Sequence, residues 1–217
     1  MSCCAQCVGV DKLFNERTAR RELRKYKRMG ADKATRKLID AVTVRMNGAT
    51  RLLDIGVGIG AVQFELIESG VLHVTNVDAS TGYLKVAEEE ATQRGVHNQI
   101  QYVFGDFTDV AEGVEQHDLV TLDKVICCYP DMHELVRSSA QKCTHLYALV
   151  YPKNGFAAKL FQTVIRMGMS LIRSPFRMYL HANSEVDAIL EAEGFREVET
   201  QSALWWQIRL FERVKDL

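Results

Sequence analysis

The sequence predicts an α/β fold, in which a mostly parallel sheet carries helices on both faces. Three observations support this prediction. Short apolar runs that each end in an acidic residue alternate along the chain with longer segments of helical character. The first of these runs passes directly into a glycine-rich stretch. The length of 217 residues suits one domain with a large core and an appendage. Strands that alternate with helices form parallel sheets with right-handed crossovers.

Residues 51–60, with the sequence RLLDIGVGIG, are the stretch around which the other elements are arranged. An apolar run is followed there by Asp54, Gly56, Gly58 and Gly60. Glycine lets the backbone turn sharply and approach a ligand without an intervening Cβ. A dinucleotide fingerprint would place a pyrophosphate where Asp54 repels it. The pattern therefore favours a nucleoside ligand with a cationic, phosphate-free head, and an ordinary strand–turn–helix corner is the alternative.

Three further strands are expected at regular intervals. Residues 71–78 form the second, which ends where a ribose diol is normally bound. Residues 100–106 form the third, and residues 118–123 the fourth. These strands end at Asp78, Asp106 and Asp123. Open parallel sheets bind ligands at the carboxyl ends of their strands, so we expect these acids to lie near one site.

The crossover helices have recognisable ends. A helix over residues 61–69 is followed by Gly70, a typical C-terminal stop. The next covers residues 80–95, with a Ser-Thr start and a final glycine, and another covers residues 131–141. Residues 107–114 are expected to be a short connector.

The C-terminal part is expected to complete the sheet. Residues 143–151 read as the fifth strand, and residues 184–193 as a helix capped by Asn183 or Ser184. Residues 196–213 then supply two strands, joined near residues 201–203. A final hairpin of this kind adds an antiparallel strand to the sheet.

Two helices are expected before the first strand. Residues 14–29 carry a narrow apolar stripe that includes Tyr26, and residues 31–46 follow, with Asp32 as the N-cap. We assign residues 1–46 to an N-terminal helical arm and residues 47–217 to the main domain. From residue 11 to residue 37 there are eleven Lys and Arg against four Asp and Glu. This basic face is either a solvated surface or a docking site for an anionic substrate or partner.

A lid-like insertion is expected at about residues 156–180. Residues 156–173 read as one amphipathic helix, and Lys159, Arg166 and Arg173 share one stripe of it. A helix that packs into the core and a peripheral membrane contact are the alternatives.

Composition excludes some classes of function. The 27 basic and 28 acidic residues create no global field for nucleic acid or a membrane. With no signal peptide and no long apolar window, we expect a cytoplasmic protein without a membrane span. Cys3, Cys4 and Cys7 have no nearby fourth soft ligand, so we expect no metal site, with metal or redox binding as the alternative.

Together these motifs resemble the class I S-adenosylmethionine-dependent methyltransferases. The resemblance implies a Rossmann-like, seven-stranded, mostly parallel sheet. It also implies S-adenosylmethionine as the methyl donor and S-adenosylhomocysteine as the product. By this resemblance the acid before the glycines faces the methionine end of the cofactor, and the acid after the third strand contacts the adenine amino group. The implied cofactor-binding residues are Asp54, Gly56, Gly58, Gly60, Asp78, Ala79, Asp106, Phe107 and Asp123.

One branch of that family is similar over more of the chain. Residues 122–130 and 179–182, with Phe14-Asn15 and Tyr26 in the arm, resemble the magnesium protoporphyrin IX O-methyltransferases, which methylate a porphyrin propionate. The chain departs from that branch at two positions around the substrate. Cys128 replaces a histidine and Leu13 replaces a tyrosine.

The loop after the fourth strand is expected to border the methyl-acceptor site. It lacks the Asn/Asp-Pro-Pro-Tyr sequence of base amino-methyltransferases, which argues against a nucleic-acid acceptor. The candidate catalytic residues are Tyr129, His133 and His181, and the candidate substrate-binding residues are Tyr26, Cys128 and Tyr129. We expect an enzyme that methylates a small molecule, preferably on oxygen. The alternatives are a porphyrin carboxyl methyltransferase and a non-catalytic cofactor-binding interaction protein.

Overall fold

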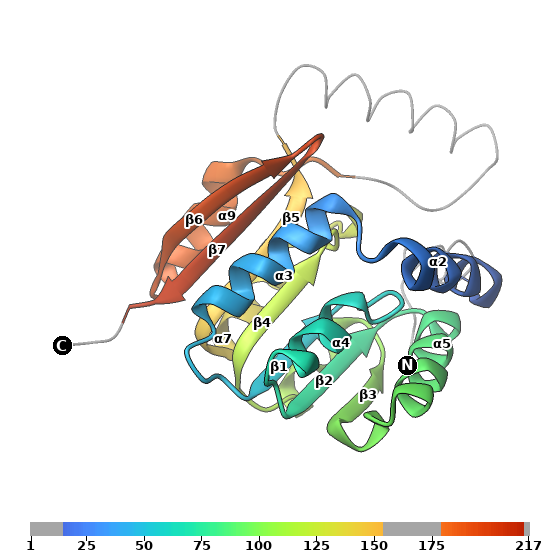
Figure 1. The fold of residues 1–217 in the computed structure, drawn as a ribbon. Coiled ribbons are helices and arrows are strands. Elements are labelled where there is room, and N and C mark those ends of the chain that lie inside the picture. Colours follow the sequence, from blue (N-terminus) through green and yellow to red (C-terminus); the bar gives the residue numbers. More distant parts are fainter. Residues whose placement is uncertain (1–14, 154–178, 215–217) are drawn as a thin grey trace.

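The computed structural model describes residues 15–153 and 179–214, and these ranges contain one seven-stranded sheet (Figure 1). Its order is β3-β2-β1-β4-β5-β7-β6. Strands β1 to β5 are parallel, whereas β7 pairs antiparallel with both β5 and β6. The predicted seven-stranded, mostly parallel sheet is confirmed. The strands are β1 (Arg51–Ile55), β2 (His73–Asp78), β3 (Ile100–Phe104), β4 (His117–Asp123), β5 (Cys143–Pro152), β6 (Phe195–Ala203) and β7 (Trp206–Arg213).

Helices cover both faces of this sheet, as predicted (Figure 1). One face carries α3 (Lys33–Arg45), α4 (Ala61–Glu68) and α5 (Thr81–Arg94), and the other carries α6 (Phe107–Val110), α7 (Met132–Gln141) and α9 (Asn183–Ala192). Short 3₁₀ turns are η1 (His97–Gln99), η2 (Ala111–Gly113) and η3 (Ile126–Cys128). Neighbouring strand residues point to opposite faces, so Leu52 joins one core cluster and Leu53 the other. Burial on both faces explains why the central strands are continuously apolar.

Of the two predicted arm helices, only α2 (Glu16–Met29) lies outside the main core. It packs beside α5, where Ala19 and Tyr26 are buried with Tyr83 (Figure 1). Helix α3 instead buries Leu38 in the core over the sheet. The division of the chain after residue 46 stays a prediction.

Gly82 is what allows α2 to approach α5 so closely. A Cβ at Gly82 would lie 2.4 Å from the backbone nitrogen of Glu16 at the start of α2. Real Cβ atoms do not come this near to backbone atoms, so a larger residue would displace the helix. An ion pair of 2.9 Å between Arg20 and Glu89 also joins the two helices.

Three expected local features differ from the structure. The β6–β7 turn lies at Leu204-Trp205 rather than at residues 201–203, because pairing continues to Ala203 and Trp206. A two-residue turn requires left-handed backbone, and Leu204 has φ 52°. The N-cap of α9 is Ala182, without a side-chain cap. Asn183, which we expected to cap it, exchanges hydrogen bonds with Gln207 instead. The connector at residues 107–114 contains a helical turn, α6.

Some predictions fall on parts of the chain outside the described residues. These are the Cys3, Cys4 and Cys7 cluster, Leu13 and Phe14, and the insertion helix of residues 156–173. Within the described ranges, none of the helices combines the length and the apolar character needed to cross a bilayer. Those ranges also hold no group of three His, Cys, Asp or Glu side chains placed to bind a metal ion.

Candidate functional site

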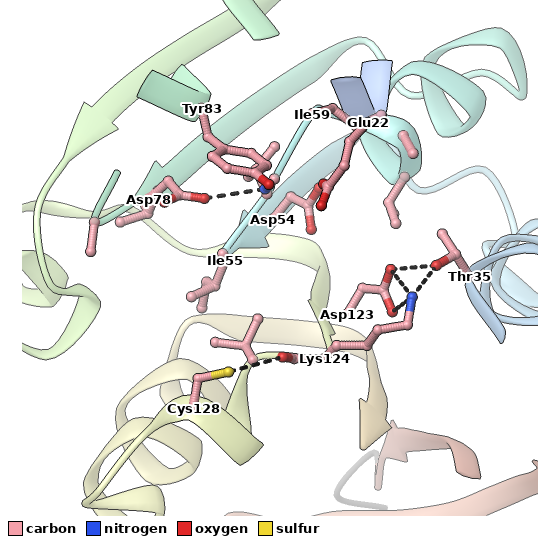
Figure 2. A pocket seen from close by; sticks show the side chains of 18 of the residues that line it. Glu22, Thr35, Asp54, Ile55, Ile59, Asp78, Tyr83, Asp123, Lys124 and Cys128 are labelled. Atoms are coloured by element: carbon pink, nitrogen blue, oxygen red, sulfur yellow. Dashed lines mark hydrogen bonds and ion pairs between the residues drawn. The ribbon is translucent and has the colours of Figure 1, made fainter. Parts of the chain in front are cut away.

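A cavity of about 600 Å³ lies at the carboxyl ends of the central strands (Figure 2). The sheet order changes direction between β1 and β4, and open α/β sheets bind ligands at such a switch point. Residues from α2 and from the start of α3 complete the wall. All predicted cofactor-binding residues line this cavity except Gly60.

The glycine loop after β1 forms one wall. Gly56, Gly58 and Gly60 all have left-handed φ values, of 67°, 57° and 84°. A Cβ at Gly56 would lie 2.5 Å from Val125, so a larger residue would collide with the loop after β4. Gly60 is the N-cap of α4 and is packed against Phe64 instead of facing the cavity. The first two glycines therefore shape the site, and the third starts the helix.

Asp54 is a buried carboxylate with one unsatisfied oxygen. Its Oδ1 accepts a hydrogen bond of 2.6 Å from Thr121 Oγ1, whereas Oδ2 has no hydrogen-bond partner among the described residues. Burial raises the pKa of Asp54 to about 7, and the neighbouring charges of Asp123 and Asp78 act in the same direction. A buried carboxylate without a counter-charge is costly, so this position favours a cationic group of a ligand.

Asp78 ties the end of β2 to the glycine loop. Its Oδ2 accepts a hydrogen bond of 3.1 Å from the backbone nitrogen of Gly58, and its Oδ1 accepts one of 2.8 Å from that of Ser80. The side chain is almost buried and faces the cavity next to Ala79 (Figure 2). A carboxylate fixed in this way can also accept hydrogen bonds from a diol.

Asp106 and Tyr129 form a second polar cluster. Asp106 caps α6 by accepting from the Thr108 backbone nitrogen at 3.2 Å, and it also accepts from the Tyr129 hydroxyl. The Tyr129 hydroxyl lies 2.7 Å from Thr108 Oγ1. We expected Tyr129 on the acceptor side, but its hydroxyl orients the acid after β3. Phe107, next to Asp106, contributes an apolar surface to the cavity.

The end of β4 carries a network of charges that sequence reasoning only partly anticipated. Asp123 Oδ2 accepts from Thr35 Oγ1 at 2.6 Å, and burial raises the pKa of Asp123. Lys124 Nζ lies 2.7 Å from both Asp32 Oδ2 and Thr35 Oγ1 (Figure 2). Burial opposes the charge of Lys124, but Asp123 and Asp32 outweigh it and raise its pKa. Lys124 also lies 5.6 Å from the ring centre of Trp206.

The predicted substrate-binding residues Tyr26, Cys128 and Tyr129 all line the cavity. The Tyr26 hydroxyl, however, donates a hydrogen bond of 3.2 Å to Glu65, which also forms a two-pronged ion pair with Arg36 at 2.6 and 2.8 Å. Burial raises the pKa of Tyr26 to about 12. Tyr26 therefore offers its ring, not its hydroxyl, to a ligand.

His133 and His181 are not among the residues that line the cavity. His133 lies with Glu185 in a separate hollow between α7 and α9. Its neighbour Met132 is buried in the core, whereas His133 itself is exposed. His181 Nε2 lies 2.9 Å from the Ile126 carbonyl, and burial lowers the pKa of His181. We therefore include neither histidine among the residues of the proposed site.

Sequence reasoning did not name several cavity residues, namely Glu22, Lys25, Thr35, Lys124 and Trp206. A signal for Glu22 was present, because it lies four residues before Tyr26 and so on the same face of a helix. Lys124 directly follows the last acid of β4, but its left-handed backbone, with φ 65°, cannot be read from the sequence.

The sheet order and the ligand-facing glycine loop define an α/β protein of the class I methyltransferase architecture. Residues 53–144 match a family model described as a methyltransferase domain. This match spans less than half of the chain, so over these residues the chain is similar to methyltransferase domains.

Known proteins are similar to different extents. Erythromycin 3''-O-methyltransferase from Saccharopolyspora erythraea is 28% identical over 95 residues, which are 42% of this chain. The aligned part spans only 31% of that enzyme. The crystal structure of magnesium protoporphyrin IX methyltransferase (ChlM) from Synechocystis PCC 6803 with bound SAH has a TM-score of 0.74 at 20% identity. That comparison covers 96% of this chain and all of the other.

The same architecture also serves other chemistry. The [4+2]-cyclase SpnF has a TM-score of 0.63 at 14% identity, over 82% of this chain and 80% of its own. These structural comparisons establish the fold, and the reaction has to be argued from the site.

Proposed function

We propose that this chain is an enzyme that transfers a methyl group from S-adenosylmethionine to a small-molecule acceptor, preferably onto oxygen. The observation that carries the proposal is the buried, unpartnered Oδ2 of Asp54 beside the glycine loop, in a cavity that Asp78 and Asp106 also line. A ligand with a cationic amino acid part, a ribose and an adenine suits these three acids in turn. Its amino acid part would lie at Asp54, its ribose at Asp78 and its adenine at Asp106. The match of residues 53–144 to a methyltransferase domain supports the same ligand.

The described residues fit the cofactor in three places. Asp54 offers an oxygen to the ammonium group of the methionine part. Gly56 and Gly58 line the cavity nearby and let the ligand come close to the backbone of the loop. Asp78 is placed to accept hydrogen bonds from the ribose hydroxyls. Asp106 and Phe107 offer an acceptor and an apolar surface to the adenine. Dinucleotides fit less well, because their pyrophosphate would meet carboxylates at this wall.

Catalysis by this chain would consist mainly of positioning. The bound cofactor supplies a methyl group that a sulfonium already activates. The protein then has to hold the acceptor atom in line with that methyl group and to exclude water. Tyr26 and Cys128 line the wall where an acceptor would lie, and Tyr129 holds Asp106. A hydroxyl acceptor also needs a proton acceptor, whereas a carboxylate acceptor does not.

A porphyrin propionate is a narrower alternative for the acceptor. The similarity of residues 122–130 and 179–182 to the porphyrin enzymes favours it, and Cys128 in place of a histidine weighs against it. A non-catalytic cofactor-binding protein is the second alternative, because the fold alone does not determine whether a reaction occurs. Both alternatives retain the cofactor site. They differ in whether an acceptor molecule binds beside Tyr26 and Cys128, and in which molecule it is.

Two measurements test the proposal. Isothermal calorimetry with S-adenosylhomocysteine and with reduced nicotinamide dinucleotide should show binding of the first and not of the second. Incubation with radiolabelled S-adenosylmethionine and fractionated metabolites, with magnesium protoporphyrin IX in a parallel reaction, should then give a labelled small molecule. Absence of binding would refute the cofactor assignment. Binding without transfer to any acceptor would favour the non-catalytic alternative.

A further inference from the structure

The arm helix α2 contributes a carboxylate to the cavity. Glu22 lines the same cavity as Asp54, although it comes from a helix that packs on α5 rather than on the sheet. Figure 2 shows its side chain descending from α2 toward Asp54 and the Tyr83 hydroxyl. Burial and then the charge of Glu22 raise the pKa of Tyr83. The Glu22 carboxylate therefore lies near enough to the Tyr83 hydroxyl for its charge to act on that group.

The charges around this part of the cavity are unbalanced. Six acidic side chains line the whole cavity, and two lysines do so. One of these, Lys124, is occupied by Asp32 and Asp123 at the far end. Ion pairs among the described residues include neither Glu22 nor Asp54. Lys25, the second lysine, also lines the cavity, but among the described residues it forms an ion pair with neither carboxylate. Two carboxylates that face one space without an ion-pair partner favour a cation between them.

We propose that Glu22 is a cofactor-binding residue, which together with Asp54 holds the ammonium group of the methionine part of S-adenosylmethionine. This inference rests on the proposed function and adds to it a role for the arm. An ammonium group has three donors, and Asp54 Oδ2 and the Glu22 carboxylate offer acceptors from the sheet and from α2. The arm thus completes the cofactor site instead of only covering it.

The packing of α2 explains how an exposed residue can serve this purpose. Glu22 is exposed, so a carboxylate on a loosely attached helix would be screened by water and salt. The close contact at Gly82 and the ion pair of Arg20 with Glu89 fix α2 against α5. The carboxylate is then placed before the ligand arrives, which reduces the entropic cost of binding.

The test compares two ligands that differ in the methionine part. S-Adenosylhomocysteine carries the ammonium group, and 5′-methylthioadenosine lacks the whole amino acid part but keeps the adenosine. Calorimetry should show that Glu22→Gln weakens the binding of S-adenosylhomocysteine by about three- to tenfold, a range typical of a partly exposed charge pair. The affinity of Glu22→Gln for 5′-methylthioadenosine should stay within about twofold of that of the unmodified protein, since this ligand lacks the ammonium group that Glu22 would contact.

Glu16→Gln is the matched control. Glu16 lies on the same helix and pairs with Arg20 and Lys85, but it does not line the cavity. It should leave both affinities within about twofold. Equal losses for Glu16→Gln and Glu22→Gln would show an effect of helix docking and would overturn the inference, and so would an unchanged affinity in Glu22→Gln. If the unmodified protein binds neither ligand, the proposed function itself fails, which is a different result.

Discussion

Replacing Asp54 by asparagine should make the ligand-free protein more stable near neutral pH. Asp54 is almost completely buried, and its pKa is about 7, against 3.8 for an unperturbed aspartate. A group whose pKa is raised on folding stabilises the protein at low pH, and this stabilisation is lost as the pH rises through the folded-state pKa. Asparagine keeps an oxygen for the hydrogen bond from Thr121 and carries no charge.

The size of the effect follows from the difference between the two pKa values. Between pH 5 and pH 8, the free energy of unfolding of the unmodified protein should fall by about 3 kcal/mol relative to that of Asp54→Asn. Comparison with the variant cancels the other titrating groups, which both proteins share. Urea unfolding of the two proteins, at several pH values between 5 and 8, measures the difference directly.

The same unfolding experiment, repeated with S-adenosylhomocysteine, tests whether the charge of Asp54 serves ligand binding. The unmodified protein should be stabilised by saturating S-adenosylhomocysteine at pH 8, because the ligand supplies a cation to the ionised Asp54. The variant should bind the ligand more weakly although it is more stable without it. Parallel pH curves for the two proteins would refute the reasoning that Asp54 ionises at a cost in the folded state.

Three other substitutions test neighbouring parts of the site. Asp78→Ala should weaken S-adenosylhomocysteine binding by about 1 to 3 kcal/mol in calorimetry, because hydrogen bonds to the ribose are lost; an unchanged affinity would remove that role. Tyr129→Phe should lower the affinity for the adenosine part, measured with 5′-methylthioadenosine, because Asp106 loses a donor. If only turnover falls, the hydroxyl acts on the acceptor instead. Gly82→Ala should displace α2, because the new Cβ would lie 2.4 Å from the Glu16 backbone. Limited proteolysis should then cut within residues 16–29 faster than in the unmodified protein, and an unchanged rate would contradict this packing.

The sheet and the acids at the carboxyl ends of its strands could be predicted because their signals are local. Each central strand is buried on both faces, as Leu52 and Leu53 illustrate, so it appears as a continuous apolar run. An acid closes each such run, so Asp54 and Asp78 can be assigned to the carboxyl ends of their strands without knowledge of the packing.

The orientations and partners of His133, Tyr129 and Lys124 could not be predicted in the same way, because they depend on contacts between distant segments. His133 is exposed because Met132 and Leu135 are the residues of the first turn of α7 that pack into the core. The Tyr129 hydroxyl bonds to Asp106, which lies 23 residues away in the sequence. The role of Lys124 depends on a partner, Asp32, that comes from the start of α3.

The contact between Asp32 and Lys124 has a consequence for how this cavity can change in evolution. Asp32 caps α3 through the Ala34 and Thr35 backbone nitrogens and at the same time binds Lys124. The beginning of a core helix and the loop after β4 are therefore linked at this end of the cavity. Loss of Lys124 would leave the largely buried Asp123 without a counter-charge, so a wider opening for bulkier ligands would require changes at both of these residues.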